Sequence, residues 1–190
     1  MPVKKQIPFT WGHFFITCTC YKWLQLIAIT NGYDLFYNWF NILKANGHFI
    51  TGYVIMPNHV HVTIAFRESK KSLNTIIGDG KRFMSYEIVK RITASRLVAI
   101  LQQLKDGVNK TDRKRGNVHE VWEDSFDWKE CCSHDFVNQK LDYMHNNPCI
   151  EKWNLSVNPY SYLHSSAKFY ISGEQGIYPV TIFWSWGMWI

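Results

Sequence analysis

Hydrophobic and polar residues alternate most regularly in residues 59–66, a pattern that predicts a half-buried β-strand. The preceding run, residues 49–56, is rich in β-branched and aromatic side chains and predicts a second strand. Pro57-Asn58 lies between the two runs and favours a tight connection, so we expect an antiparallel hairpin. In the later strand, His59 and His61 lie on the face opposite the alternating hydrophobic residues.

Residues 12–21 are also dense in β-branched and aromatic types and predict a first strand. A helix is predicted to start at Tyr33 and to stop at Asn46-Gly47, because apolar residues recur between them at helical spacing. The members of that apolar series are Phe36, Trp39, Phe40 and Leu43.

A basic helical region follows the hairpin. Ser72 is a candidate cap for its first segment, and Gly78 and Gly80 predict a break or bend, because each weakens a helix by about 1 kcal/mol relative to Ala. Ser85 is a candidate cap for a second segment that continues to Leu104.

Residues 105–117 have almost no apolar content and predict a solvated, mobile loop. Val118 to Trp128 is a candidate fourth strand, and Ser133 is the expected cap of a helix that Pro148 ends. The order β-α-β-β-α-β followed by a helix predicts an α+β fold, a ferredoxin-like antiparallel sheet with helices packed on it.

The length and composition indicate one globular domain. The chain has 190 residues, of which 46% are hydrophobic, so we treat 1–190 as a single domain with a core at about 11–165 and an uncertain tail at 166–190. Five cysteines form no C-x-x-C pair, which favours reduced thiols. Without a signal peptide or a membrane-length apolar run, we expect a cytoplasmic protein that does not insert into a membrane.

The formal net charge of +6 and a pI of about 9.0 favour a polyanionic partner. Nucleic acid is the first candidate, and an anionic membrane surface is the second. Aromatic residues make up 16% of the chain, and such side chains stack on unpaired bases as well as fill a core.

The candidate chemistry starts from His59 and His61, whose Cβ atoms are expected about 6–7 Å apart. On the helix at about 133–147, Tyr143 and Asn147 lie one above the other beside the core stripe. If this helix packs on the histidine face, two imidazoles and the Asn147 amide oxygen make an open site for a divalent ion such as Mg²⁺ or Mn²⁺. Tyr143 is then the candidate nucleophile, and Lys140, one turn earlier, is the candidate supporting charge.

Two motifs carry a resemblance to a known family. They are Gly52-Tyr53-Val54-Ile55-Met56-Pro57-Asn58-His59-Val60-His61 and Lys140-Leu141-Asp142-Tyr143-Met144-His145-Asn146-Asn147-Pro148. Together they resemble the single-tyrosine transposases of the HUH endonuclease superfamily, in which a His-hydrophobic-His strand and a helix-borne Tyr cut single-stranded DNA. The chain looks closest to the REP-associated tyrosine transposases, where the Tyr is followed four residues later by Asn and then Pro. The resemblance extends from the first strand to about Tyr162.

The resemblance implies a ferredoxin-like fold and a metal-assisted transesterification. In it, Tyr143 attacks the scissile phosphate and leaves a 5′-phosphotyrosine link and a free 3′-hydroxyl. Family substrates are hairpins flanked by single strand, and family members act as monomers or homodimers. The basic side chains that we select as DNA contacts are Lys81, Arg82, Arg91, Arg113, Lys114 and Arg115.

Two alternatives stay open. One is a non-catalytic nucleic-acid-binding module on the same fold, and the other is a metal-dependent hydrolase in which water is the nucleophile. The remaining histidines, His48 and His145 among them, are interpreted as surface or capping residues. Trp153 is interpreted as a core or rim residue.

Overall fold

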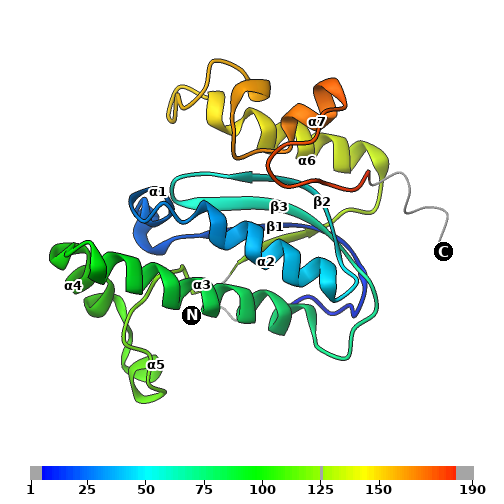
Figure 1. Ribbon diagram of the computed structural model, residues 1–190. Coiled ribbons are helices and arrows are strands. Elements are labelled where there is room, and N and C mark those ends of the chain that lie inside the picture. The colour runs from blue at the N-terminus through cyan, green and yellow to red at the C-terminus, as the bar shows by residue number, and fades with distance from the viewer. Residues whose placement is uncertain (1–5, 125, 183–190) are drawn as a thin grey trace.

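A four-stranded antiparallel sheet lies at the centre of the chain in a computed structural model that describes residues 6–124 and 126–182 (Figure 1). Its strands have the spatial order β2-β3-β1-β4, with bounds β1 Gly12–Thr19, β2 Phe49–Ile55, β3 His59–Phe66 and β4 Asp127–Glu130. The helices are η1 Tyr21–Trp23, α1 Leu26–Ile29, α2 Tyr33–Ala45, α3 Leu73–Ala94, α4 Val98–Gly107, α5 Lys110–Lys114, α6 His134–Asn146, η2 Asn147–Cys149, η3 Pro159–Ser161 and α7 Ala167–Ser172. The predicted α+β fold, with an antiparallel sheet covered by helices, is confirmed.

Helices cover both faces of the sheet: α2 and α3 lie on one side, and α6 and α7 lie on the other (Figure 1). The larger core fills the space between the sheet and α2 and α3, where Val62 of β3, Phe36 of α2 and Ile88 of α3 are fully buried. A smaller apolar cluster joins the sheet to α6, with members Phe15, Val54, Met56, Val137, Leu141 and Met144. Every residue of β3 is therefore buried, on the histidine face as well as on the apolar face.

The basic helical region differs from its prediction. α3 runs unbroken through Gly78 and Gly80, and Ser85 caps nothing, because its hydroxyl donates to the Lys81 carbonyl at 2.8 Å. Gly80 is buried against α2, where an added Cβ would overlap the indole nitrogen of Trp39. Close packing of the two helices therefore outweighs the weak helix propensity of glycine.

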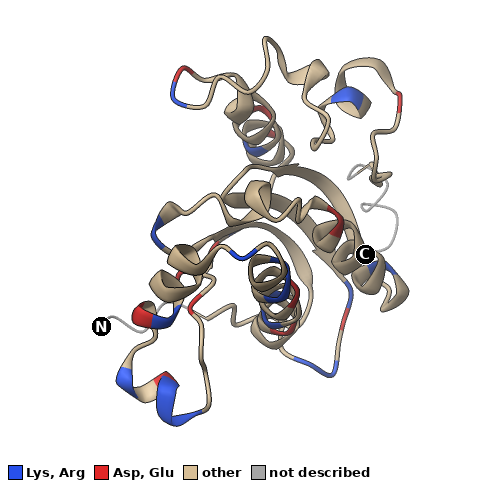
Figure 2. Cartoon of the chain, turned by 60° about the vertical axis from the view of Figure 1, so that its left-hand side comes forward, with Lys and Arg blue, Asp and Glu red and all other residues tan. Residues whose placement is uncertain are grey.

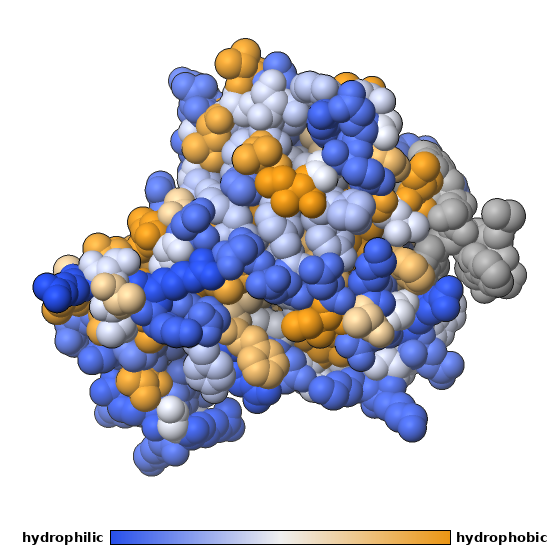
Figure 3. Space-filling view, viewed as in Figure 1, coloured by the Kyte–Doolittle hydropathy of each residue, from blue (hydrophilic) through white to orange (hydrophobic). Residues whose placement is uncertain are grey.

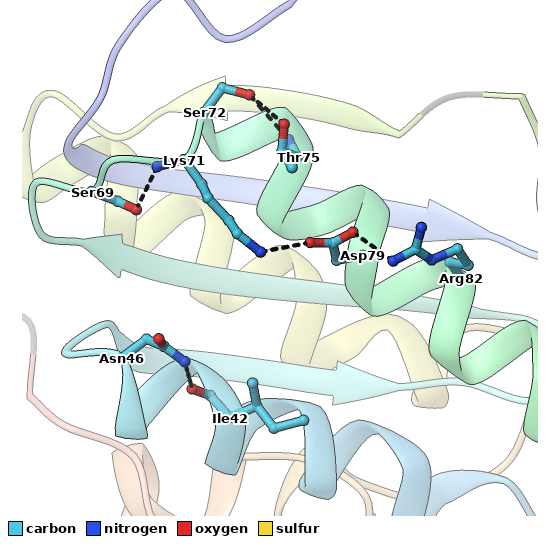
Figure 4. Close-up of polar contacts among 8 residues, drawn as sticks. All are labelled: Ile42, Asn46, Ser69, Lys71, Ser72, Thr75, Asp79 and Arg82. Carbon is cyan, nitrogen blue, oxygen red and sulfur yellow. Dashed lines mark hydrogen bonds and ion pairs between the residues drawn. The ribbon is translucent and has the colours of Figure 1, made fainter.

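The predicted cap of α3 is confirmed, since the Ser72 hydroxyl accepts from the Thr75 backbone N–H at 3.2 Å and contacts its side chain (Figure 4). One turn later, Asp79 forms ion pairs with Lys71 and Arg82, each at 3.1 Å. The Arg82 guanidinium thus has an acidic partner on its own helix.

Two predictions that follow α3 are wrong. Part of the predicted loop at 105–117 is helical, because α4 continues to Gly107 and the Asn109 side chain caps α5. The fourth strand is shorter and later than the predicted Val118 to Trp128. Trp122 is buried in the main core and donates its indole N–H to the Lys81 carbonyl at 2.9 Å, which draws this segment toward the helices.

α6 starts after the predicted cap, where the Ser133 hydroxyl accepts from the Phe136 backbone N–H at 3.2 Å. It ends at Asn146, but not for the predicted reason. Asn147 keeps helical dihedral angles (φ −53°, ψ −43°), and Pro148 continues into the 3₁₀ turn η2. The side chain of Asn147 is therefore fixed at a helical position instead of fraying.

Two histidines predicted as surface or capping residues are buried. His145 pairs with the Ser166 hydroxyl at 2.9 Å, and burial lowers the pKa of its ring to about 4. His48 packs edge-on against Phe66 in the main core. His145 is covered because residues 165–182 add a layer beside β2, where the Thr181 N–H donates to the Ile50 carbonyl at 2.9 Å. The Trp-rich run 183–190 lies outside the described residues.

Exposed hydrophobic side chains on the face seen in Figure 3 are spread among hydrophilic ones. Among the exposed hydrophobic residues, Ile42 lies on α2 and Phe83 lies on α3. Within residues 6–124 and 126–182, no helix combines the length and apolar character needed to span a bilayer.

The contrast between two glycines of α3 gives a test of the packing. Gly80→Ala should lower the free energy of unfolding by about 2 kcal/mol or more, because the methyl group overlaps Trp39. Gly78→Ala meets open space and should raise it by about 0.5–1 kcal/mol through helix propensity. Urea denaturation of both variants measures the difference, and equal effects would contradict the close α2–α3 packing.

Candidate active site

The two histidines of β3 lie side by side, as their alternation predicts. Their ring centroids are 4.8 Å apart. β1 pairs with this strand in antiparallel register, so that Thr17 lies opposite His61 and Thr19 opposite His59. The histidine face is therefore set by the long pairing of β1 with β3.

α6 packs on this histidine face. It comes close to the sheet at Gly52 of β2, where an added Cβ would lie 2.5 Å from both the Leu141 and the Met144 side chains. The absence of a side chain at Gly52 thus lets α6 approach the sheet. The predicted metal site requires this packing of α6 on the histidine face.

Tyr143 projects from α6 beside His61, with ring centroids 5.3 Å apart. Its ring also meets Phe15 edge-on at 6.2 Å, and 54% of the side chain remains exposed. The Lys140 ammonium lies 5.9 Å from the Tyr143 ring centroid and 5.3 Å from that of Phe15. A buried ring contact on one side and open solvent on the other give the phenol both a fixed position and access to a substrate.

Asn147 completes the group from the end of α6. Its side-chain amide nitrogen lies 3.3 Å from Nε2 of His61. The amide oxygen is buried and, within the described part of the chain, has no hydrogen-bond partner. A buried unsatisfied carbonyl oxygen is costly and suggests a partner that the protein alone does not supply.

The other ring nitrogens have partners that orient both imidazoles. Nδ1 of His59 donates to the Asn58 side-chain oxygen at 2.7 Å, and Nδ1 of His61 contacts the Thr17 hydroxyl at 2.8 Å. Because Asn147 offers an N–H to Nε2 of His61, we place the His61 proton on Nδ1. The Nε2 lone pair of His61 then faces the Asn147 amide at the end of α6, and the bond from Nδ1 of His59 leaves its Nε2 unprotonated.

Burial keeps both imidazoles neutral. It lowers the pKa of His61 to about 3, with further contributions from His59 and the Lys140 charge. Burial and the Lys152 charge lower the pKa of His59 to about 4. Neutral imidazole is the form that binds a metal ion.

The donor set fits a divalent ion with open coordination positions. Two neutral Nε2 atoms and the buried amide oxygen of Asn147 are the available ligands, and a half-turn of the amide would direct that oxygen toward His61. Among the residues that the structure describes, no group of three or more His, Cys, Asp or Glu side chains converges to hold a metal. A metal ion bound by the two histidines of β3 would therefore need the Asn147 amide oxygen as its third protein ligand.

The basic residues selected as DNA contacts lie elsewhere, on α3, on α5 and directly after α5, on the side of the sheet opposite α6 (Figures 1 and 2). Lys81, Arg82 and Arg115 line one groove of about 660 Å³ between α3 and residues 112–124. Lys114 is exposed, and Arg113 donates to the Lys105 carbonyl at 2.9 Å. Contact with DNA stays a prediction for all six residues.

Arg91 has a structural partner. Its guanidinium forms a two-pronged ion pair with Asp34 of α2, at 2.8 and 2.6 Å, and also donates to the Asn31 carbonyl at 2.9 Å. The pair raises the pKa of Arg91 and lowers that of Asp34, each chiefly through the hydrogen bond to the other. This arginine connects α3 to the start of α2.

Comparison with known proteins gives a match at the level of the fold. No protein-family model matches the chain, and neither does any curated protein sequence. Among solved structures, a REP-associated tyrosine transposase bound to a REP hairpin is 15% identical, covering 91% of this chain and 87% of its own, with a TM-score of 0.57. The chain has the fold of that transposase.

A second structure comes from Deinococcus radiodurans R1 and is provisionally described as a transposase. It is 14% identical and covers 76% of this chain and 97% of its own, with a TM-score of 0.36. That score is too low to support an argument. The two motifs resemble those of the tyrosine transposases, and the fold that this resemblance implies is confirmed by the first structure.

Several residues at the site are not predicted by the sequence pattern. Asn58 stands in the motif but was interpreted only as part of a tight connection, and Thr17 reaches His61 only through the β1–β3 register. Trp23 and Trp153 both pack against His59, with ring centroids 5.6 Å from it. The sequence predicts Trp153 only as a core or rim residue, and no local pattern points to Trp23.

The low pKa values of His59 and His61 predict rings that stay neutral as the pH falls from 8 to 5, well below the ordinary histidine value near 6.5. Side-chain ¹⁵N NMR of the folded protein measures the protonation state of each ring. Because only the unfolded chain gains these protons between about pH 6.5 and 4, the folded state should lose stability over that range. Protonation of either ring at pH 6 would contradict the buried site.

Proposed function

We propose that the chain is a transposase-type DNA endonuclease that cuts and rejoins single-stranded DNA next to hairpins through Tyr143. The observation that carries the proposal is the contact of Tyr143 and Asn147 with His61 of the same chain, on the face that also holds His59. The fold of a transposase that binds a REP hairpin supports the DNA class.

The chain's own residues supply the positioning. Phe15 and His61 hold the ring of Tyr143, so that the phenol approaches a phosphate lying over the histidine face along a restricted path. The Lys140 charge lies next to this ring and favours the phenolate that develops during attack. Because these contacts lie within one chain, we propose that Tyr143 acts in cis.

The reaction is a transesterification. The Tyr143 oxygen forms a bond to phosphorus, the bond to the upstream 3′-oxygen breaks, the phenol proton passes to solvent and the departing 3′-oxygen gains a proton. The products are a 5′-phosphotyrosine link and a free 3′-hydroxyl, and attack by a 3′-hydroxyl on that link rejoins DNA. A divalent ion, Mg²⁺ or Mn²⁺, held by His59, His61 and Asn147 would withdraw charge from the phosphate.

Removal of the phenol oxygen tests the nucleophile. Tyr143→Phe should abolish the covalent protein–DNA band formed with labelled single-stranded hairpin oligonucleotides in the presence of Mn²⁺ or Mg²⁺, because only the attacking atom is lost. Tyr160→Phe, at an exposed tyrosine on η3, is the matched control and should leave the band unchanged. Cleavage that survives Tyr143→Phe would favour a hydrolase that uses water.

Removal of either imidazole tests the phosphate site. His59→Ala and His61→Ala should each lower the rate of adduct formation at least a hundredfold, while binding of the hairpin persists and weakens steeply with salt. His134→Ala, at the exposed start of α6, is the control. An unchanged rate of adduct formation in either histidine variant would refute the metal assignment. Hairpin binding by the wild type without any cleavage would favour the alternative of a non-catalytic nucleic-acid-binding module.

A further inference from the structure

Two tryptophans and a lysine surround the outer side of His59. The ring centroids of Trp23 and Trp153 are each 5.6 Å from that of His59. The Lys152 ammonium lies 5.0 Å from each indole centroid. Trp23 is 53% exposed, although a large apolar side chain of this kind is usually covered.

The backbone at Trp23 adopts an unfavourable conformation. Lys22 and Trp23 have positive φ values, 49° and 59°, a conformation that side chains other than glycine rarely adopt. Asn58 donates its amide N–H to the Trp23 carbonyl at 2.9 Å and accepts from His59 at 2.7 Å. One side chain thus fixes both the exposed indole and a candidate metal ligand, and strain of this kind collects at functional sites.

The position of Trp23 and Trp153 relative to Tyr143 indicates which side of the cut they would bind. Contacts along the histidine face run from Tyr143 to His61, from His61 to His59, and from His59 to the two indoles. In a displacement at phosphorus, the attacking and leaving oxygens lie on opposite sides. For a phosphate lying over the two histidines, attack from Tyr143 would direct the leaving 3′-oxygen away from Tyr143, toward Trp23 and Trp153.

We propose that Trp23 and Trp153 bind the base of the nucleotide immediately 5′ of the cut, the one released with a free 3′-hydroxyl, and that Lys152 contacts its phosphate. This inference rests on the proposed function. Indole rings stack on any unpaired base, and an ammonium beside them attracts the DNA backbone. The site would hold the 3′-hydroxyl end close to the phosphotyrosine until rejoining.

Binding in the absence of metal tests the site without cleavage. The probes are the single-stranded oligonucleotide dT12 and a twelve-residue abasic strand of equal charge, measured by fluorescence anisotropy in EDTA. Trp23→Ala should weaken binding of dT12 about tenfold and leave binding of the abasic strand unchanged. Trp11→Ala is the matched control, since Trp11 is 54% exposed and precedes Gly12, which pairs with Phe66 at the far end of β3 from His59.

Trp153 is partly buried against the smaller cluster, so its test needs a variant that keeps the volume. Trp153→Leu retains an apolar side chain without an aromatic face and should also weaken dT12 binding, with an unchanged melting temperature. Loss of dT12 affinity in both tryptophan variants supports the site. Affinity equal to that of the wild type in both would overturn it.

The side of the cut on which the tryptophans bind is tested with hairpin substrates that the wild type cleaves. The position of the cut is first located from the lengths of the products. An abasic residue immediately 5′ of the cut should slow wild-type adduct formation about tenfold, and Trp23→Ala should be insensitive to it. The same lesion immediately 3′ of the cut should have a smaller effect. A larger effect on the 3′ side would overturn this inference alone, whereas a wild type that forms no adduct with any hairpin would overturn the proposed function.

Discussion

The site depends on the close approach of α6 to the sheet at Gly52. A side chain at this position would displace Leu141 and Met144, and with them the helix that carries Tyr143 and Asn147. Because both residues reach His61 only at the present separation, one missing Cβ brings the candidate nucleophile and the amide to the histidines. The apolar cluster below α6 thus has a functional consequence as well as a stabilising one.

The same packing sets the electrostatics of the histidine face. Covering β3 on both sides removes water from His59 and His61, and the two nearby lysines add positive charge, so both rings stay neutral. The polar partners Asn58 and Thr17 then orient the rings. The Asn147 amide nitrogen faces Nε2 of His61, and its buried oxygen is left without a protein partner among the described residues.

Local periodicity was enough to predict much of this arrangement. The two-residue period of β3 placed both histidines on one face, and the helical period of α6 placed Tyr143 above Asn147. What failed depends on contacts distant in sequence. Gly78 and Gly80 predict a break in α3 because glycine has a low helix propensity. The break is absent because the indole of Trp39, which packs over Gly80, comes from another helix and is not visible in the local sequence. Thr17, Trp23 and Trp153 meet the histidines only after β1 and α6 are in place.

Identification of the atom that joins protein to DNA tests the central claim most directly. The wild-type protein would be incubated with a single-stranded hairpin oligonucleotide and Mn²⁺, digested with protease and nuclease, and analysed by mass spectrometry. The account predicts a peptide in which Tyr143 carries a nucleotide through its 5′-phosphate. Attachment to any other residue, or a cut strand ending in a free 5′-phosphate with no linked peptide, would contradict it.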